Sequence, residues 1–339
     1  TRRSSDLLFY SLEERIRRGR PIPFPLAALL SAMTPAWRLG MMRRLRQDRQ
    51  RVDAYVVSFG NITAGGTGKT PGVIERARAE IAAGKRVAVI TRGYGAKQGL
   101  PPVIVEGVTS LAKLVNAIGD EPALIARRAP GVAIVKCADR VAAARAALRE
   151  CKSEVLILDD GFQCVALERD EDILVIDATN PFGNGHLVPR GILREPMTHA
   201  RRATHIVMTR CDQVSNLPAL VEQVRMLCPD APVRLTRHAP TGLWRPTNNE
   251  DLPLDMLKGA SVRAVCGIGN PEAFFRTLQD LGADLAATMP FRDHSAIPPR
   301  ALVSDGVIVT TEKDAVRIPN PPENLLALRI ELKDMAANS

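Results

Sequence analysis

Short apolar runs alternate with longer segments of helical periodicity through most of the chain. The apolar runs lie at 54–60, 85–95, 132–137, 155–163, 172–178 and 204–210. Helical patterns lie at 75–85, about 119–128 and 139–150. Strands that read as nearly continuous apolar runs are typical of parallel sheets buried on both faces, joined by right-handed helical crossovers. The pattern therefore predicts an α/β protein with a mainly parallel sheet flanked by helices.

The pattern changes beyond about Cys211, where a second and smaller α/β lobe is expected. It predicts, in order, a helix near 217–227, a strand at 233–240, a polar loop at 241–256, a strand at 262–270, a helix at 271–282 and a last strand at 306–311. A chain of 339 residues suits two lobes at roughly 150 residues per domain. We expect an N-terminal arm at 1–51, a core at 52–210 and the second lobe at 211–339.

A glycine-rich loop follows the first apolar run and is typical of phosphate binding. The residues are Gly65, Gly66, Thr67, Gly68, Lys69 and Thr70. Backbone N–H groups at such a loop and helix start point at phosphate oxygens, the lysine adds a charge, and the threonine hydroxyl can bind Mg²⁺. The common P-loop pattern would place its first glycine at position 63, which is threonine here, so this loop is a variant. It is closer to the MinD-like branch, although Ala64 stands where a lysine often precedes those glycines.

Paired carboxylates end the run at 155–163, where Asp159 and Asp160 precede a glycine turn and Gln163. In a P-loop protein the neighbouring strand brings its carboxyl end beside the phosphates, which is where an acid that organises Mg²⁺ is expected. An Asp-Asp-Gly turn alone would be unremarkable. Together with the glycine loop, it indicates a metal role.

Composition narrows the class of protein. With 45% apolar and 24% charged residues, the chain can bury a substantial core and is not disordered. The six cysteines show no C-x-x-C spacing, so neither a zinc site nor a disulfide framework is indicated and a reduced cytosol fits best.

Charge is concentrated in the N-terminal arm. Residues 1–51 hold 12 arginines and no lysine against four acids, which gives +8 of the total +9. Between the arginine clusters, residues 21–37 are uncharged but contain four prolines, so lying in a membrane interface is favoured over crossing it. Anionic lipid would meet the flanking arginines. A helix packed on the body remains an alternative, and so does nucleic-acid binding, although the arm has few aromatics for base stacking.

Three further motifs carry weaker signals by spacing alone. Asp120 and Glu121 open a predicted helix, where acids are favoured by the helix dipole without any catalytic role. Asp293 and His294 fall in a loop of the second lobe, where a lone histidine is usually solvated. Tyr94, in a strand-end Arg-Gly-Tyr-Gly, could contact phosphate or substrate, or could belong only to a turn.

Seven ordered motifs together resemble the tetraacyldisaccharide 4'-kinase family, from about residue 20 to 318. They are GN-x3-GGTGKTP (60–71), TRGYG (91–95), GDEP (119–122), DDGFQ (159–163), FGNGHLVPRGILREP (182–196), DH (293–294) and TEKDAV (311–316). The resemblance implies a P-loop NTPase-like kinase that transfers the γ-phosphate of ATP, with Mg²⁺, to the 4'-hydroxyl of tetraacyldisaccharide 1-phosphate, a lipid A precursor. It also implies an arm docked on the anionic cytoplasmic face of the bacterial inner membrane, with no nucleic-acid partner.

Roles carry over position by position from the resemblance. Lys69 and Thr70 would hold the phosphates and Mg²⁺, with Asp159 and Asp160 on the metal side. Asp120 matches the family's catalytic carboxylate, and a sugar hydroxyl needs a base as it attacks.

The remaining matches are a histidine and three residues expected to line the site. His294 matches the family's histidine partner of the carboxylate, which would orient it and tune its pKa. Tyr94, Gln163 and Glu195 are expected to line the site.

Two features leave alternatives open. The family usually has histidine where this chain has Cys164, and that histidine could arrange metal or phosphate or could only pack behind the strand. The segment 311–314 resembles the T/N-K-x-D base-reading motif of related P-loop proteins, though a strand-end turn is equally consistent. The alternative function is a MinD-like switch ATPase that acts through a protein partner, against which Ala64 already counts.

Overall fold

The computed structural model describes residues 15–16, 19–93, 100–107, 111–293 and 295–335. Their contacts group the chain into two compact units. Unit 1 comprises 1–69, 139–237 and 334–339, and unit 2 comprises 70–138 and 238–333. The chain passes from one unit to the other after Lys69, Ala138, Arg237 and Lys333. The arm, core and lobe boundaries expected from the sequence stay a prediction.

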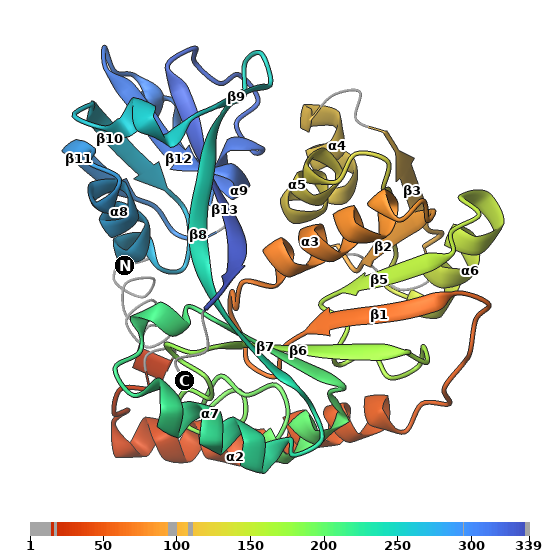
Figure 1. Ribbon diagram of the computed structural model, residues 1–339. Helices are drawn as coiled ribbons and strands as arrows, with labels where there is room; N and C mark the ends of the chain where they lie inside the picture. The colour runs from red at the N-terminus through yellow and green to blue at the C-terminus, as the bar shows by residue number, and fades with distance from the viewer. Residues whose placement is uncertain (1–14, 17–18, 94–99, 108–110, 294, 336–339) are drawn as a thin grey trace. The chain divides into compact units, whose positions relative to one another are not determined.

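Unit 1 is built on a parallel sheet with the strand order β5-β1-β6-β7-β8 (Figure 1). Its strands are β1 (Tyr55–Gly60), β5 (Val155–Asp159), β6 (Glu171–Asp177), β7 (His205–Thr209) and the first part of β8 (Val233–Arg245). Its helices are α2 (Phe24–Leu45), α6 (Arg140–Glu150) and α7 (Leu217–Leu227), with the 3-10 helices η1 (Met197–Arg202) and η2 (Cys211–Gln213). The apolar runs thus form the buried parallel strands that their pattern predicts.

The tip of β1 packs tightly against the turn that follows β5. Phe59 is in register with Asp159, and the Gly161 N–H donates to the Phe59 carbonyl at 2.9 Å. A Cβ on Gly60 would lie 2.5 Å from the Phe162 Cβ, so only glycine fits at this crossing. Phe162 itself is fully buried. This close approach brings the paired carboxylates to the strand end from which the glycine loop departs.

The first part of unit 2 is a small mixed sheet with helices. Its elements are α3 (Lys69–Ala82), β2 (Val87–Thr91), β3 (Val103–Glu106), α4 (Leu111–Ile118), α5 (Asp120–Arg128) and β4 (Ala133–Lys136). Strand β4 pairs parallel with β2 and antiparallel with β3. Strand β3 has only three apolar residues before Glu106 and is half-exposed, and no strand was predicted from this short pattern.

The second part of unit 2 is a sheet with the order β11-β10-β12-β13-β8, and β9 pairs with β8. Its further strands are β9 (Glu250–Leu252), β10 (Ser261–Cys266), β11 (Asp284–Pro290), β12 (Val307–Thr311) and β13 (Leu325–Asp334). Its helices are α8 (Pro271–Asp280), α9 (Glu312–Ala315), η3 (Leu254–Leu257) and η4 (Pro299–Leu302). The core between this sheet and α8 is apolar and includes Phe274, Phe275 and Leu278.

Two predictions for this region were wrong. The segment 241–256 is not a loop, because β8 continues to Arg245 and the Leu243 and Trp244 side chains are fully buried. Pro240 and Gly242 interrupt the apolar pattern and concealed the strand. The strand at 306–311 is not the last, because β13 follows it and pairs parallel with β12.

Residues 24–45 of the arm form one long helix, α2, in spite of their prolines. Pro23 is the N-cap residue of α2 and Pro25 lies in its first turn, where a missing N–H costs nothing. Pro35 lies inside the helix. Within the described ranges, none of the helices has both the length and the apolar character required to cross a membrane.

Candidate active site

The backbone of the loop between β1 and α3 is not covered by neighbouring side chains at Gly65 and Gly66. Gly65 and Gly68 have φ angles of 121° and 81°, which favour glycine. A Cβ on Gly65 or Gly66 would meet no atom within 4 Å, so neighbouring side chains do not fill the space beside the loop. The Thr67 hydroxyl is buried and has no hydrogen-bond partner among the described residues, while its carbonyl accepts from the Thr209 hydroxyl at 2.9 Å. The loop is thus fixed to β7 and still open to an anion.

Lys69, the first residue of α3, lies with its ammonium group among oxygen atoms of unit 1. Its Nζ donates to Asn61 Oδ1 at 3.1 Å and lies 3.3 Å from Asp160 Oδ1. The Lys69 side chain is 13% exposed. Asn61 is fixed in turn, because its Nδ2 donates to the Thr63 carbonyl at 2.8 Å. The ammonium is therefore held at the loop by a neutral and a charged partner.

Asp160 is the charged group that balances this lysine. It has a φ of 57°, in the left-handed region that aspartate tolerates better than most residues. Arg194 Nη1 donates to both of its oxygens, at 3.0 and 2.8 Å. Burial would raise the pKa of Asp160, but the charges of Lys69 and Arg194 outweigh it and lower the pKa to about 2. Asp160 is ionised throughout the physiological pH range.

Asp159 ends β5 and is 6% exposed, so the two consecutive carboxylates face different surroundings. Thr70 lies in the first turn of α3. No cluster of three or more His, Cys, Asp or Glu side chains suited to a metal occurs in the part of the chain that the structure describes. Mg²⁺ in a nucleotide site usually takes one or two carboxylates and completes its shell with phosphate and water. The carboxylates of Asp159 and Asp160 are donors of this kind.

Gln163 and Glu195 lie directly behind the loop. Gln163 Nε2 donates to the Asn61 carbonyl at 2.9 Å and to Glu195 Oε1 at 3.0 Å. Glu195 is fully buried, and Arg202 Nη1 and His199 Nδ1 each lie 2.8 Å from its Oε2. Burial would raise the pKa of Glu195, but the Arg202, His199 and Gln163 contacts lower it. Glu195 therefore orients its neighbours.

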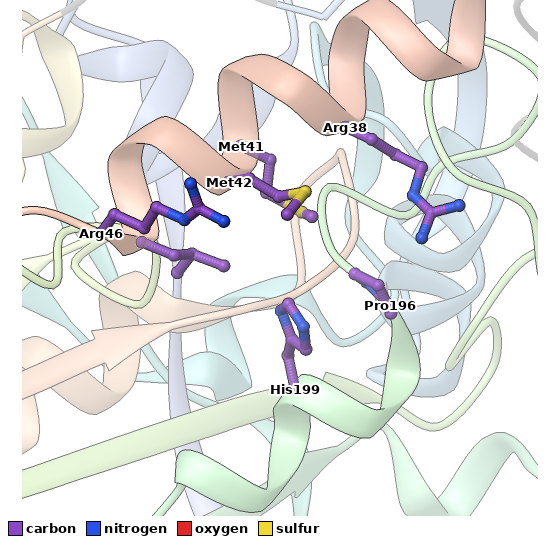
Figure 2. Close-up of a pocket in the computed structure, with 7 residues that line it drawn as sticks. Arg38, Met41, Met42, Arg46, Pro196 and His199 are labelled. Carbon is purple, nitrogen blue, oxygen red and sulfur yellow. The ribbon is translucent and has the colours of Figure 1, made fainter.

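His199 continues this polar chain to the wall of a cavity under the arm helix. The cavity has a volume of about 320 Å³ and is lined by Arg38, Met41, Met42, Leu45, Arg46, Pro196 and His199. Figure 2 shows the α2 side chains on one wall and the His199 ring on the other. The Trp37 Nε1–H also donates to the Arg194 carbonyl at 3.0 Å. The Trp37 contact thus connects α2 with Arg194, whose guanidinium pairs with Asp160.

Asp120 lies in unit 2 as the first residue of α5. The preceding Gly119 has a φ of 102° and no side-chain cap. Asp120 Oδ2 is 3.7 Å from Arg317 Nε, and Glu121 Oε1 is 3.1 Å from Lys313 Nζ. Lys313 Nζ is also 3.6 Å from Asp293 Oδ1. The structure therefore brings Asp293 together with the GDEP and TEKD motifs.

The predicted base-reading role of Asp314 does not fit its surroundings. Asp314 is fully buried, and its Oδ2 accepts from the Gly267 N–H at 2.9 Å and from the Thr311 hydroxyl at 2.7 Å. Its other oxygen is paired with Arg317. A carboxylate whose acceptor sites are occupied in this way closes a strand-end turn, which was the alternative interpretation.

Two of the predicted site residues are not described by the structure, and two residues at the site were not predicted. Tyr94 and His294 lie outside the described residues. Cys164 is half-buried, and its carbonyl accepts from Arg169 Nη1 at 2.7 Å. Sequence reasoning missed Asn61 and Arg194, although both lie in motifs that it quoted, because spacing alone does not show which side chains meet.

The low pKa of Asp160 predicts a specific dependence of stability on pH. Its folded pKa of about 2 is below the ordinary value of 3.8, so its ionised form stabilises the fold above pH 4 and this contribution is lost as the pH falls towards 2. The free energy of unfolding of the wild type minus that of Asp160→Asn should therefore shrink between pH 6 and pH 3. Urea unfolding at both pH values measures the difference, with Asp53→Asn as an exposed control in the same unit. A difference that is the same at both pH values would contradict the charge balance described here.

Comparisons with known proteins agree over nearly the whole chain. A model of the family described as tetraacyldisaccharide-1-P 4'-kinase matches residues 21–338. The tetraacyldisaccharide 4'-kinase of Anaeromyxobacter sp. (strain K) is 41% identical over 321 residues, covering 89% of this chain and 84% of the relative. That of Geobacter sulfurreducens is 39% identical over 310 residues, covering 86% and 85%.

A solved structure shows the same fold. The crystal structure of LpxK from Aquifex aeolicus in complex with ATP is 28% identical to this chain. It superimposes with a TM-score of 0.68 and covers 99% of this chain and 96% of that one. The P-loop-type α/β fold and the resemblance inferred from the seven motifs are both confirmed, and this chain belongs to the tetraacyldisaccharide-1-P 4'-kinase family.

Proposed function

We propose that this chain transfers the γ-phosphate of ATP to the 4'-hydroxyl of tetraacyldisaccharide 1-phosphate, a step of lipid A biosynthesis. Family membership supports the reaction, because the match spans most of both chains. The ATP in the Aquifex aeolicus structure supports the donor. In this chain, the observation that carries the assignment is Lys69, which lies at an open glycine loop beside an ionised Asp160.

The donor phosphates would bind at this loop. Backbone N–H groups near Gly65, Gly66 and Gly68 would donate to phosphate oxygens, and Lys69 would contact the β and γ phosphates. The phosphates and Asp160 then compete for one ammonium group. Arg194 contacts Asp160 independently of Lys69, so the carboxylate stays oriented when the lysine turns to the nucleotide. Transfer relies mainly on such positioning and on charge neutralisation.

Asp159, Asp160 and Thr70 are the residues that would hold Mg²⁺. Bound there, the ion would neutralise charge on the β and γ phosphates. Asp160 is already ionised at neutral pH and needs to lose no proton to act as a ligand. Its pairing with two cations also offsets the cost of burying the charge.

Asp120 would accept the proton of the sugar hydroxyl as it attacks. Its side chain is 19% exposed, so it is partly shielded from water yet accessible. The dipole of α5 and the nearby Arg317 guanidinium both favour a negative charge at this helix start. His294, by its match to the family, would orient this carboxylate.

Replacing Asp120 should strongly reduce turnover and spare nucleotide binding. General-base catalysis contributes about 10²–10⁴-fold, so Asp120→Asn and Asp120→Ala should lower kcat by about three powers of ten. The measurement is transfer of label from γ-labelled ATP into a detergent-dispersed tetraacyldisaccharide 1-phosphate, followed in the organic phase. Equilibrium ATP binding is measured in parallel.

Glu272→Gln is the matched control, because Glu272 is also an acid in the first turn of a unit 2 helix. It should leave kcat unchanged. Loss of ATP binding in the Asp120 variants would instead assign Asp120 a structural role. No labelled lipid from the wild type would overturn the proposed reaction itself.

The arm would dock the enzyme on the cytoplasmic face of the inner membrane. Large apolar side chains of α2 are exposed to solvent, among them Phe24 at 84% and Leu29 at 60%. Arg43 and Arg44 lie in the last turn of the helix. A helix that exposes both apolar and basic side chains can bind an anionic lipid surface by burying the former and pairing the latter.

Removing the exposed apolar side chains of α2 should weaken vesicle binding. Replacing Phe24, Leu29 and Met33 by serine keeps the helix but removes the apolar side chains that would enter the lipid. Cosedimentation with anionic vesicles should therefore fall at least tenfold. The control replaces Met226 and Val303 by serine. These residues lie outside α2 and are 66% and 70% exposed. Deleting residues 1–45 should have the larger effect. Equal vesicle binding by both sets of variants would remove the membrane role from α2.

A further inference from the structure

We propose that Lys313 and Arg317 are positioning residues that set the orientation and charge of the Asp120 carboxylate. This inference rests on the proposed function, in which Asp120 is the general base. It assigns a role to the TEKD segment, which the mechanism above does not use.

The segment around α9 is itself firmly held. The Thr311 hydroxyl accepts from the Asp314 N–H at 3.1 Å and caps the short helix. The buried Asp314 carboxylate is fixed by the Gly267 N–H and is paired with Arg317. A buried carboxylate with this many donors does not move at low cost. The residues that flank it, Lys313 and Arg317, therefore extend from a rigid base.

One end of α5 is anchored on this segment by a buried ion-pair network. Glu312, 6% exposed, lies 3.0 Å from Arg127 Nη1 and 2.6 Å from Arg128 Nη1. Arg128 Nη2 also pairs with Glu331 at 2.7 Å, and the Arg127 guanidinium lies 3.7 Å from the Trp244 ring centroid. These contacts are at the carboxyl end of α5. They fix the helix but do not touch its catalytic end.

Lys313 joins the amino end of α5 to the loop that precedes His294. Its ammonium group lies 3.1 Å from Glu121 and 3.6 Å from Asp293, and its side chain is 22% exposed. Burial alone would lower the pKa of Lys313, but Glu121, Asp293 and Asp120 raise it. The lysine thus stays protonated at neutral pH and holds two acidic motifs together.

Arg317 contacts the catalytic carboxylate directly. Its Nε lies 3.7 Å from Asp120 Oδ2, while its Nη2 is engaged by Asp314. The guanidinium side chain is 14% exposed, so its charge is only partly screened by water. A cation held at this distance favours the ionised base and restricts the direction in which it points.

The elements next to this end of α5 carry further charged groups. On its own helix the neighbour is Glu121, an acid. From α4 and β4, Lys113 is exposed and Lys136 Nζ donates to the Ala117 carbonyl at 3.0 Å. Asp293 and Asp314 are acids. The ion pairs described above place Lys313 and Arg317 at the first turn of α5.

The pH dependence of kcat separates a positioning role from a merely structural one. Removing a positive charge beside Asp120 raises the pKa of this base, so the acidic limb of the kcat profile moves to higher pH. Lys313→Met should lower kcat about tenfold and move that limb up by about one pH unit, with the KM for ATP unchanged. Lys313→Arg, which keeps the charge, should restore both kcat and the position of the limb.

Two further variants keep the test decisive. Lys258→Met removes an exposed lysine that pairs with Asp255 at 2.8 Å in the same unit, and it should change neither kcat nor the profile. Arg317→Lys keeps a positive charge beside Asp120. The acidic limb of the kcat profile of this variant should therefore stay at the wild-type pH even if kcat falls. Circular dichroism and thermal unfolding establish the folded fraction of each variant.

The failure of this inference can be told apart from failure of the proposed function. An active wild type, together with a folded Lys313→Met whose acidic limb does not move, would overturn the positioning role alone. A fall in kcat that only follows the folded fraction would do the same. A folded wild type that forms no labelled lipid at any pH would overturn the proposed function and this inference with it.

Discussion

The ion pair between Lys69 and Asp160 is the constraint on which the rest of unit 1 depends. A lysine at the start of α3 and a carboxylate just after β5 meet because β1 and β5 are in register and Gly60 allows the turn at Phe162 to approach. A partly buried ammonium or carboxylate alone would be costly, whereas here the carboxylate is paired with both Lys69 and Arg194. The arrangement keeps a cation at the open loop and an ionised oxygen donor beside it, which are the two requirements for holding a nucleotide with its metal.

A carboxylate paired with a fixed cation also occurs in unit 2. There the carboxylate of Asp120 stands at a helix start, and the cations come from the α9 segment, which is fixed by a fully buried aspartate. In both units a carboxylate of the proposed site lies beside a cation whose own position is set by other contacts. Side chains that are locked in this way lose little entropy when a substrate binds, which is how a preorganised site lowers a barrier.

The sequence predicted the strands and the loop better than the contacts between loops. The strands at 155–159 and 54–60 could be recognised because apolar residues fill most of their positions, and the glycine loop because glycine is needed for its backbone angles. The contact of Arg194 with Asp160 joins residues 34 positions apart through an irregular segment, for which periodicity gives no signal. Likewise the spacing of residues 311–314 resembled the T/N-K-x-D motif. Only the structure shows that Asp314 is buried and that its oxygens already accept hydrogen bonds. Local patterns determine elements, whereas the pairing of charges depends on the tertiary fold.

Equilibrium binding of ATP with Mg²⁺ to the wild type and to Lys69→Met tests the central claim most directly. The exposed Lys85→Met serves as a control for the loss of a positive charge. Lys69 is placed to contact the phosphates, so its replacement should weaken ATP binding at least tenfold, about 1.4 kcal/mol, while the control binds as the wild type does. Equal affinity of all three proteins for ATP would contradict the account, because the ammonium held by Asp160 would then contribute nothing to the nucleotide.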